Sequence, residues 1–302
     1  MDDGSGIPDV VVVGAGPAGC GAAVQCARLG LNVKIVDRTG TPGGLVREAR
    51  LLENYPGLPK NVPGAIFSEF LSDFLENNGL RPARIEVERI SREEDYFTVT
   101  WSGGSMKART LVIAVGTRPV GYSPENAEGV TIHRSILPLL EKPPPGVAVI
   151  GGGESALDYA LNLSDRGSKV VLLVRGSSFR AGGLLAERVL SRPGISVLFE
   201  TTLSGATPTR NGTVKIRLDS GGVAFYIDVH AVLAAVGRRP IFPETDFRVF
   251  RRPGNVETSV PGFFICGDAS LGSLGQASIA AGQGVLAGTE ASRFIRRGKS
   301  WK

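Results

Sequence analysis

The chain has 302 residues, which is enough for two modest domains that each bury their own core. It is 42% apolar and 21% charged, and its net charge of +5 is the small difference between 34 basic and 29 acidic residues. No basic run carries interleaved aromatic residues, so the composition argues against nucleic-acid binding. Its three cysteines, at positions 20, 26 and 266, form no CxxC pair and no metal-ligand pattern, so we expect no disulfide framework, no metal site and a reducing, cytoplasmic location.

Two uncharged runs, 10–27 and 269–289, have nearly the length of a membrane span. An acidic leader precedes the first run, and glycines and Pro17 interrupt it, which argues against a signal peptide. The second run is rich in Gly, Ser, Ala and Gln. Both runs are predicted to be buried inside protein, with no membrane association.

The first chemical motif is DVVVVGAGPAG, residues 9–19, an apolar strand followed by a glycine turn and the start of a helix. In this context Gly14 makes the tight turn, Gly16 lets a pyrophosphate approach the backbone, and Gly19 permits close helix packing. The next predicted strand ends at Asp37, whose carboxylate can accept a hydrogen bond from a ribose 2′-hydroxyl. The pattern predicts a dinucleotide site, with purely structural glycines as the alternative.

A second copy, VAVIGGGESA, follows at residues 147–156, with Gly151, Gly153 and Ala156 as an accepted variant of the motif. The position equivalent to Asp37 is Val174, and Arg175 and Arg180 follow it. A missing acid beside guanidinium groups favours a 2′-phosphate and hence NADPH. NADH remains open, because both arginines can also be ordinary surface charges.

Both copies continue with a second strand, then alternating strands around a Ser-Gly-Gly turn, and each closes on Gly-x-Arg-Pro, at 116–119 and 237–240. The segment VPGFFICGDAS, 260–270, has no domain of its own and is expected to return to the first unit. We therefore predict an α/β fold with two Rossmann-like dinucleotide-binding domains of the three-layer ββα type. Residues 1–116 and 241–302 form an FAD-binding domain, and 117–240 form an inserted NAD(P)H-binding domain.

Two dinucleotide sites in one chain imply a resident FAD and a visiting nicotinamide that transfers hydride to it. Asp268, which follows an apolar strand, is placed to accept from ribityl hydroxyls, with a helix cap as the alternative role. A helix predicted from Gln276 to about Arg297 can stabilise negative charge on the reduced flavin through its N-terminal amides. Hydride transfer needs no general base, so no catalytic side chain is predicted.

The motifs GAGPAG, PGGLVREARLLENYPG, VIAVGTRP, VIGGGESA, VRGSSFRA, AAVGRRP, FFICGDAS and GQASIAAGQG together resemble the thioredoxin reductase family of low-molecular-weight pyridine nucleotide-disulfide oxidoreductases. The likeness covers nearly the whole chain. It implies a two-segment FAD domain, an inserted NADPH domain that rotates between two arrangements, and a homodimer.

Carried over by position, the resemblance implies two sets of cofactor-binding residues. The flavin set is Gly14, Gly16, Pro17, Ala18, Asp37, Arg38, Gly43, Gly44, Leu45, Asn54, Val87, Ala114, Gly116, Gly267, Asp268, Gly275, Gln276 and Ala277. The nicotinamide set is Gly151, Gly152, Gly153, Glu154, Ser155, Ala156, Arg175, Arg180 and Gly237.

The sequence departs from the family pattern at three places. Leu45 stands where the family usually has a glutamine near the flavin, and VRGSSFRA replaces a His-Arg-Arg pattern. The family's redox-active CxxC, about fifteen residues before the second glycine turn, is replaced by HRSILPL, residues 133–139. Cys20 and Cys26 are predicted to be packing residues that point about 120° apart on one helix. Cys266 is predicted to be a strand residue, and His133 a structural histidine.

The leading functional prediction is an NAD(P)H-dependent flavoprotein that passes electrons from FAD to an external acceptor and lacks thioredoxin reductase activity. Such acceptors include ferredoxin, flavodoxin, a quinone, oxygen or a small disulfide. One alternative is a subunit that feeds a partner protein carrying the missing redox centre, docked by the basic tail of residues 293–302. Another is a flavin-binding scaffold without turnover. Trp301 could cover the flavin, but a frayed terminus is the favoured interpretation.

Overall fold

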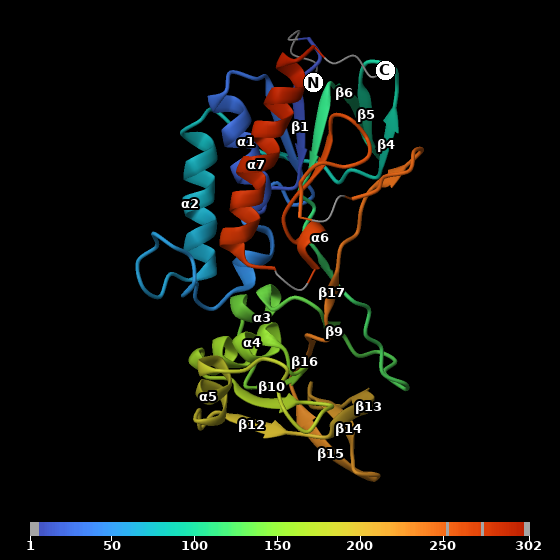
Figure 1. Ribbon diagram of the computed structural model, residues 1–302. Helices are drawn as coiled ribbons and strands as arrows, with labels where there is room; N and C mark the ends of the chain where they lie inside the picture. The colour runs from blue at the N-terminus through green and yellow to red at the C-terminus, as the bar shows by residue number, and fades with distance from the viewer. Residues whose placement is uncertain (1–5, 252–253, 273–274, 299–302) are drawn as a thin grey trace. The chain divides into compact units, whose positions relative to one another are not determined.

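The structure is a computed structural model that describes residues 6–251, 254–272 and 275–298. It consists of two compact units (Figure 1). Unit 1 comprises Met1–Arg47, Leu51–Arg118 and Arg239–Lys302, and unit 2 comprises Glu48–Arg50 and Pro119–Arg238. The sequence placed the two divisions after residues 116 and 240. Which cofactor each unit holds stays a prediction, and Trp301 lies outside the described residues.

Unit 1 is built on a parallel five-stranded sheet whose central strand is the four-valine run of the first motif. All four of these valines are buried, as expected of a parallel strand covered on both faces. In spatial order the strands are β19 (Phe263–Ile265), β7 (Thr110–Ile113), β1 (Val10–Val13), β2 (Val33–Asp37) and β3 (Ala83–Arg84).

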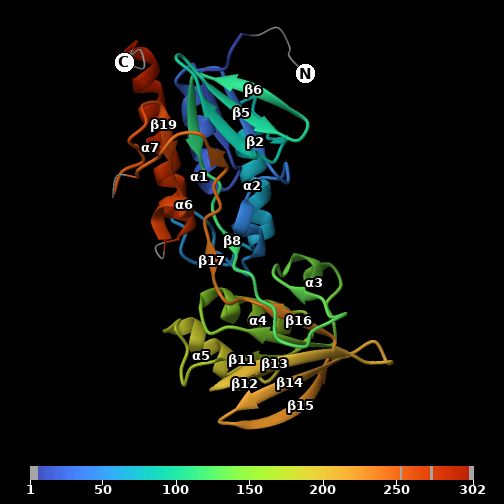
Figure 2. The same cartoon turned by 90° about the vertical axis from the view of Figure 1, so that its right-hand side faces the viewer.

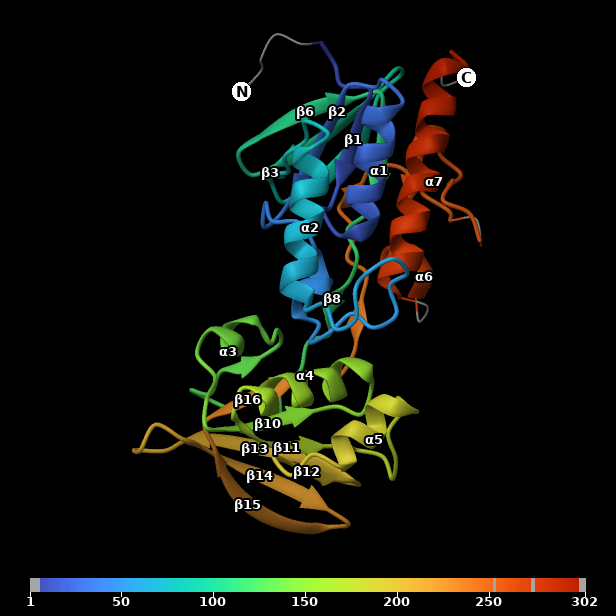
Figure 3. The same cartoon turned by 90° about the vertical axis from the view of Figure 1, so that its left-hand side faces the viewer.

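Helices cover one face of this sheet and a smaller sheet covers the other. The helices α1 (Pro17–Arg28), α2 (Gly64–Glu76) and α7 (Ala277–Arg296) lie side by side on the first face (Figure 3). The second face carries β4 (Arg89–Arg92), β5 (Phe97–Trp101), β6 (Gly104–Ala108) and β18 (Glu244–Thr245). Small residues allow α1 and α7 to touch: a Cβ on Gly284 would lie 1.9 Å from the Ala18 carbonyl oxygen.

Unit 2 repeats this architecture (Figure 2). Its parallel sheet runs in the order β12 (Ile195–Leu198), β11 (Lys169–Leu173), β10 (Gly146–Ile150), β16 (Ala231–Ala234) and β9 (Ile132–His133). One face carries α3 (Leu137–Glu141), α4 (Glu154–Asp165) and α5 (Leu184–Leu190). The other face carries the antiparallel strands β13 (Thr201–Pro208), β14 (Val214–Ser220) and β15 (Val223–Val229).

The two sheets have the same strand order, but they obtain their fifth strand from different parts of the chain. In unit 1 the fifth strand is β19, so the returning C-terminal segment completes the unit as predicted. In unit 2 it is β9, which comes before the glycine turn and pairs with β16. The two chain crossings, β8 (Arg118–Pro119) and β17 (Arg238–Arg239), pair with each other. The predicted fold class is confirmed.

The remaining elements are short. A 3-10 helix, η1, spans Gly44–Glu48, and α6 spans Asp268–Leu271. Among the described residues, no helix has the length and apolar character needed to cross a membrane.

Candidate dinucleotide sites

The first glycine turn has one open position between two sterically closed ones. Gly14 has φ +106°, and a Cβ on it would lie 2.3 Å from the Ala114 carbonyl oxygen. A Cβ on Gly19 would lie 1.8 Å from the Gly14 carbonyl oxygen. Around Gly16, by contrast, no atom of the described residues lies within 4 Å of the Cβ position. Gly14 and Gly19 therefore satisfy the fold, whereas Gly16 leaves room for a ligand.

The start of α1 supplies hydrogen-bond donors beside this open position. The helix begins at Pro17, and its N-cap residue is Gly16, which has no side chain to accept from the first-turn amides. Those amides and the positive end of the helix dipole suit a pyrophosphate. The turn thus fits the adenine dinucleotide part of FAD on steric and electrostatic grounds.

Asp37 is held against this turn at the end of β2. Its Oδ2 accepts from the backbone nitrogen of Ala15 at 3.0 Å, and its Oδ1 accepts from the Thr39 nitrogen and Oγ1, both at 2.7 Å. A carboxylate has about four acceptor positions, so one remains for a ribose hydroxyl. Thr39 is a positioning residue that the sequence analysis missed, although the Asp-x-Thr spacing is typical of such local turns.

Other predicted flavin residues from distant parts of unit 1 converge on the same edge. The Gly43 nitrogen donates to the Ala15 carbonyl at 2.8 Å, and a Cβ on Gly44 would lie 3.5 Å from the Gly16 Cα. A Cβ on Gly267 would lie 2.8 Å from the Ala18 Cβ. The edge therefore joins residues from η1, α1 and the end of β19.

Two further predicted flavin residues, Asn54 and Gln276, form a hydrogen-bonded pair. Asn54 Nδ2 donates to Gln276 Oε1 at 2.5 Å, and Gln276 is the N-cap residue of α7, which begins at Ala277. The helix predicted from Gln276 to about Arg297 is thus confirmed as Ala277–Arg296. Its first turn contains no acidic residue, so no carboxylate of the helix itself neutralises the positive end of its dipole.

Asp268 is the first residue of α6, after the N-cap residue Gly267. It is therefore not the N-cap of that helix, which weakens the helix-cap alternative. Its carboxylate lies near the start of α7, because a Cβ on Gly275 would be 3.2 Å from Asp268 Oδ1.

The remaining predicted flavin residues take other positions. Gly116 follows β7 with φ +59°. Arg38 is exposed directly after Asp37, Leu45 is half-buried in η1, and Val87 is half-buried between β3 and β4. Their roles stay predictions.

The second glycine turn repeats the steric logic of the first. Gly151 has φ +142°, and a Cβ on it would lie 2.4 Å from the Ala235 carbonyl oxygen. The third position is Ala156, which is fully buried, and its own Cβ lies 3.0 Å from the Cβ position of Gly151. α4 begins at Glu154 after the N-cap residue Gly153, so its first-turn amides also lack a side-chain cap from that residue.

A basic loop lies directly on this second turn. The backbone nitrogens of Arg180 and Ala181 donate to the Gly152 carbonyl at 2.7 and 3.2 Å, and Phe179 packs on Phe199 with 5.1 Å between ring centroids. A Cβ on Gly153 would lie 3.6 Å from Arg180 Nη2. The guanidinium of Arg180 therefore reaches the open glycine, where an anionic group of a dinucleotide would bind.

The other predicted nicotinamide residues differ in their exposure. Arg175 and Glu154 are exposed, Ser155 is half-buried, and Val174 is buried at the end of the strand where unit 1 has Asp37. Gly237 has φ +130° and accepts from the Val120 nitrogen at 2.9 Å. The structure thus brings Arg180 to the glycine turn, and the role of Arg175 stays a prediction.

The three cysteines are packing residues. All are fully buried, and the Cys20 and Cys26 thiols face different carbonyl oxygens, those of Ala15 and Gly288. Burial raises the pKa of each thiol to about 12, from an ordinary value of 9.0. None of them is a thiolate at neutral pH, so none is a reactive nucleophile.

His133 lies on the edge strand β9, opposite Leu233 of β16. Burial lowers its pKa, which keeps the imidazole neutral. The prediction of a structural histidine agrees with this position in a strand ladder.

The family model for pyridine nucleotide-disulphide oxidoreductases matches residues 8–284. The chain belongs to this family. As a member, it is an NAD(P)H-dependent flavoprotein oxidoreductase, and membership supports FAD and NADPH as its cofactors.

Similar proteins agree with this assignment. The chain is 31% identical over 306 residues to a thioredoxin reductase of Rickettsia bellii, covering 95% of this chain and 98% of the relative. It is 29% identical over 312 residues to NADPH-dependent thioredoxin reductase 3 of Arabidopsis thaliana, covering 96% of this chain and 58% of that protein. The crystal structure of Lactococcus lactis thioredoxin reductase superposes with a TM-score of 0.85 at 24% identity, covering 96% and 99% of the two chains, which shows a shared fold.

Proposed function

We propose that this family member passes electrons from NADPH through FAD to an external acceptor without an internal dithiol. The proposal rests on the composition and burial of residues 133–139 in unit 2. This stretch contains no cysteine, and it contributes Ile136, fully buried, and Leu139, 5% exposed, to the hydrophobic core. Unit 2 has no cysteine anywhere, and the three thiols of unit 1 are buried and protonated.

Each cofactor has a defined set of residues in this proposal. FAD would be bound by the Gly16 turn, Asp37 and the Asn54–Gln276 pair, and NADPH by the Gly153 turn with Arg180 beside its 2′-phosphate. When bound, FAD supplies the two-electron chemistry. The protein orients the cofactors, and the start of α7 stabilises negative charge on the reduced ring.

A subunit that feeds a redox partner is the second candidate. Arg293 and Arg296 in the last turn of α7 give this end of unit 1 a basic character that suits an acidic carrier such as ferredoxin or flavodoxin. The resemblance to the thioredoxin reductase family implies a homodimer as the working assembly.

An anaerobic titration tests the proposal. NADPH added to the FAD-loaded protein is expected to bleach the flavin absorbance stoichiometrically, and small acceptors such as ferricyanide are expected to restore it. A variant with Cys20, Cys26 and Cys266 all replaced by alanine is the matched control and is expected to bleach equally well if folded. Failure of NADPH to bleach the flavin, or NADPH-driven reduction of a thioredoxin disulfide at an enzymatic rate, would contradict the proposal.

A further inference from the structure

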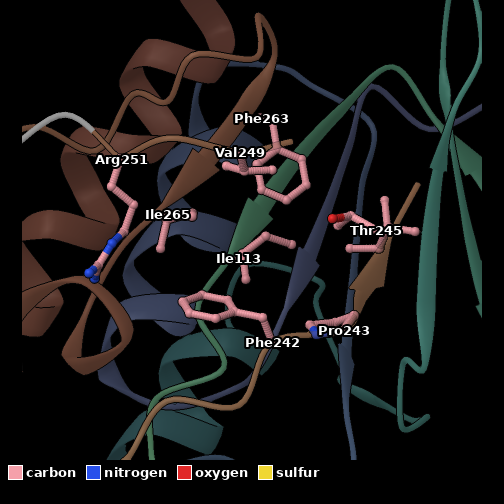
Figure 4. Close-up of a pocket in the computed structure, with 9 residues that line it drawn as sticks. Ile113, Phe242, Pro243, Thr245, Val249, Arg251, Phe263 and Ile265 are labelled. Atoms are coloured by element: carbon pink, nitrogen blue, oxygen red, sulfur yellow. The ribbon is translucent and has the colours of Figure 1, made fainter. Parts of the chain in front are cut away.

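Unit 1 contains an apolar pocket that none of the predicted cofactor residues lines. Its volume is about 230 Å³, and it lies between the parallel sheet and the returning segment 242–251 (Figure 4). The lining residues are Ile90, Ile113, Phe242, Pro243, Thr245, Val249, Arg251, Phe263 and Ile265. The pocket could not be predicted from the sequence, because its lining residues come from four separate segments that meet only in the folded unit.

The pocket adjoins the predicted flavin edge along the chain. Ile113 ends β7 and is followed directly by Ala114, and Ile265 ends β19 and is followed after one residue by Gly267. Both Ala114 and Gly267 contact the α1 region of the first glycine turn. In α/β folds, ligands bind outside the carboxyl ends of parallel strands, and the pocket opens beside two such ends.

Arg251 is the cationic residue among those that line this apolar pocket. Arg251 lies at one end of the pocket in Figure 4, with Pro243 and Thr245 at the other and Ile113 and Phe242 between them. Its Nη1 donates to the Ala269 and Ser270 carbonyls at 2.9 and 3.5 Å, which fixes the guanidinium in place. A guanidinium has five N–H donors in a fixed fork, so these two bonds leave donor capacity for an oxygen of a ligand.

We propose that this pocket binds a quinone of one or two fused rings as the external electron acceptor, with Arg251 donating to a quinone oxygen. Apolar walls suit a planar ring, and a volume below the ~300–1,000 Å³ of drug-sized sites excludes larger molecules and protein carriers. A guanidinium favours an oxygen that gains negative charge during reduction. The redox part of this inference rests on the function proposed above.

The reaction balances without a thiol. NADPH provides a hydride, which is two electrons and one proton, and solvent provides a second proton. The two quinone C=O groups become two C–OH groups, and the products are NADP⁺ and the quinol. The flavin that would relay the two electrons undergoes no net change in this balance.

The test uses 2-methyl-1,4-naphthoquinone with the FAD-loaded protein. Val249→Phe fills the pocket and Arg251→Met removes its cation, while Arg248→Met is the matched control, because Arg248 is exposed in the same segment and does not line the pocket. Each pocket variant is expected to raise the Michaelis constant for the quinone by about tenfold, the loss expected for one charged hydrogen bond or a blocked ring site. FAD content, bleaching by NADPH, turnover with ferricyanide and the Arg248→Met variant are expected to be unchanged.

Equilibrium dialysis of the same quinone against oxidised protein without nucleotide measures binding apart from turnover. Wild-type binding that both pocket variants weaken supports the site even if NADPH fails to bleach the flavin, so the two proposals can fail separately. Unchanged quinone constants in both variants would overturn the inference. Loss of FAD from Val249→Phe in a still-folded protein would also overturn it, because the pocket would then belong to the flavin.

Discussion

Alanine in place of Gly16 is expected to weaken FAD binding and leave the apoprotein folded. Gly16 has φ −72° and ψ −179°, an extended conformation that alanine adopts without strain, and no described atom lies within 4 Å of its Cβ position. Alanine lowers the conformational entropy of the unfolded chain, which stabilises the folded state by ~0.4–1 kcal/mol. This gain roughly offsets the loss of ~0.5–1 kcal/mol that comes from alanine being a poorer N-cap residue than glycine. The free energy of unfolding should therefore change by less than about 1 kcal/mol.

In the complex, the same methyl group occupies the space through which a pyrophosphate approaches the backbone. Overpacking of a fitted site costs ~1–3 kcal/mol, which corresponds to a dissociation constant about 5 to 150 times higher. Gly19→Ala is the matched comparison, because its Cβ would lie 1.8 Å from the Gly14 carbonyl oxygen. That clash is between backbone atoms, so Gly19→Ala is expected to destabilise the apoprotein itself by more than ~3 kcal/mol.

The assay combines thermal or urea unfolding of both apoproteins with titration by FAD, followed by quenching of flavin fluorescence. The steric difference between the two glycines predicts that Gly16→Ala unfolds like the wild type and binds FAD weakly, and that Gly19→Ala unfolds early. Wild-type FAD affinity in Gly16→Ala, or equal instability of the two variants, would refute it.

Two further predictions concern the basic loop and the thiols. Arg180→Met is expected to raise the Michaelis constant for NADPH about tenfold while that for NADH stays unchanged, because a charged hydrogen bond to the 2′-phosphate is lost. The control is Arg210→Met, since Arg210 is an exposed arginine of the same unit. An unchanged ratio of the two Michaelis constants in Arg180→Met would contradict the site. The pKa of Cys266 is raised by burial from 9.0 to about 12 in the folded protein, so its protonated form contributes stability that is complete below pH 9 and is lost as the pH rises toward 12. Unfolding titrations should show a decline over that window that Cys266→Ala reduces, and rapid labelling of the native thiols at pH 8 would contradict their burial.

The parts of the fold predictable from the sequence are those set by local backbone geometry. Gly14 and Gly151 are required because each has a positive φ and sits against a carbonyl oxygen of the neighbouring strand. Because each lies between an apolar strand and a helix, both turns, both central strands and the position of Asp37 could be predicted. Such features depend on a few neighbouring residues and therefore appear as short motifs.

The features that escaped prediction depend on pairing between distant segments. The strand β9 has only two residues, and its parallel pairing with β16 across about a hundred residues has no periodic signal. Arg180 and Gly153 were predicted for one site, but the two backbone bonds to the Gly152 carbonyl that hold the loop of Arg180 on the turn could not be predicted from the spacing. Arg175 was predicted for the same site, is exposed, and keeps an untested role.

The difference between the two units bears on the proposed path of electrons out of the protein. Both units have a glycine turn with uncapped helix amides, but the carboxylate of Asp37 lies at the turn of unit 1 and the guanidinium of Arg180 lies at the turn of unit 2. In a dithiol reductase the relay would follow β9, where this chain has Ile136 buried in the same core cluster as Leu157 and Leu233. Fully burying such a side chain contributes about 1.5–3 kcal/mol, so this stretch stabilises unit 2 and has no redox group to offer. Under the proposed function an acceptor takes its electrons directly from the flavin, so variants of Val249 and Arg251, rather than variants of the cysteines, are expected to change turnover with a quinone.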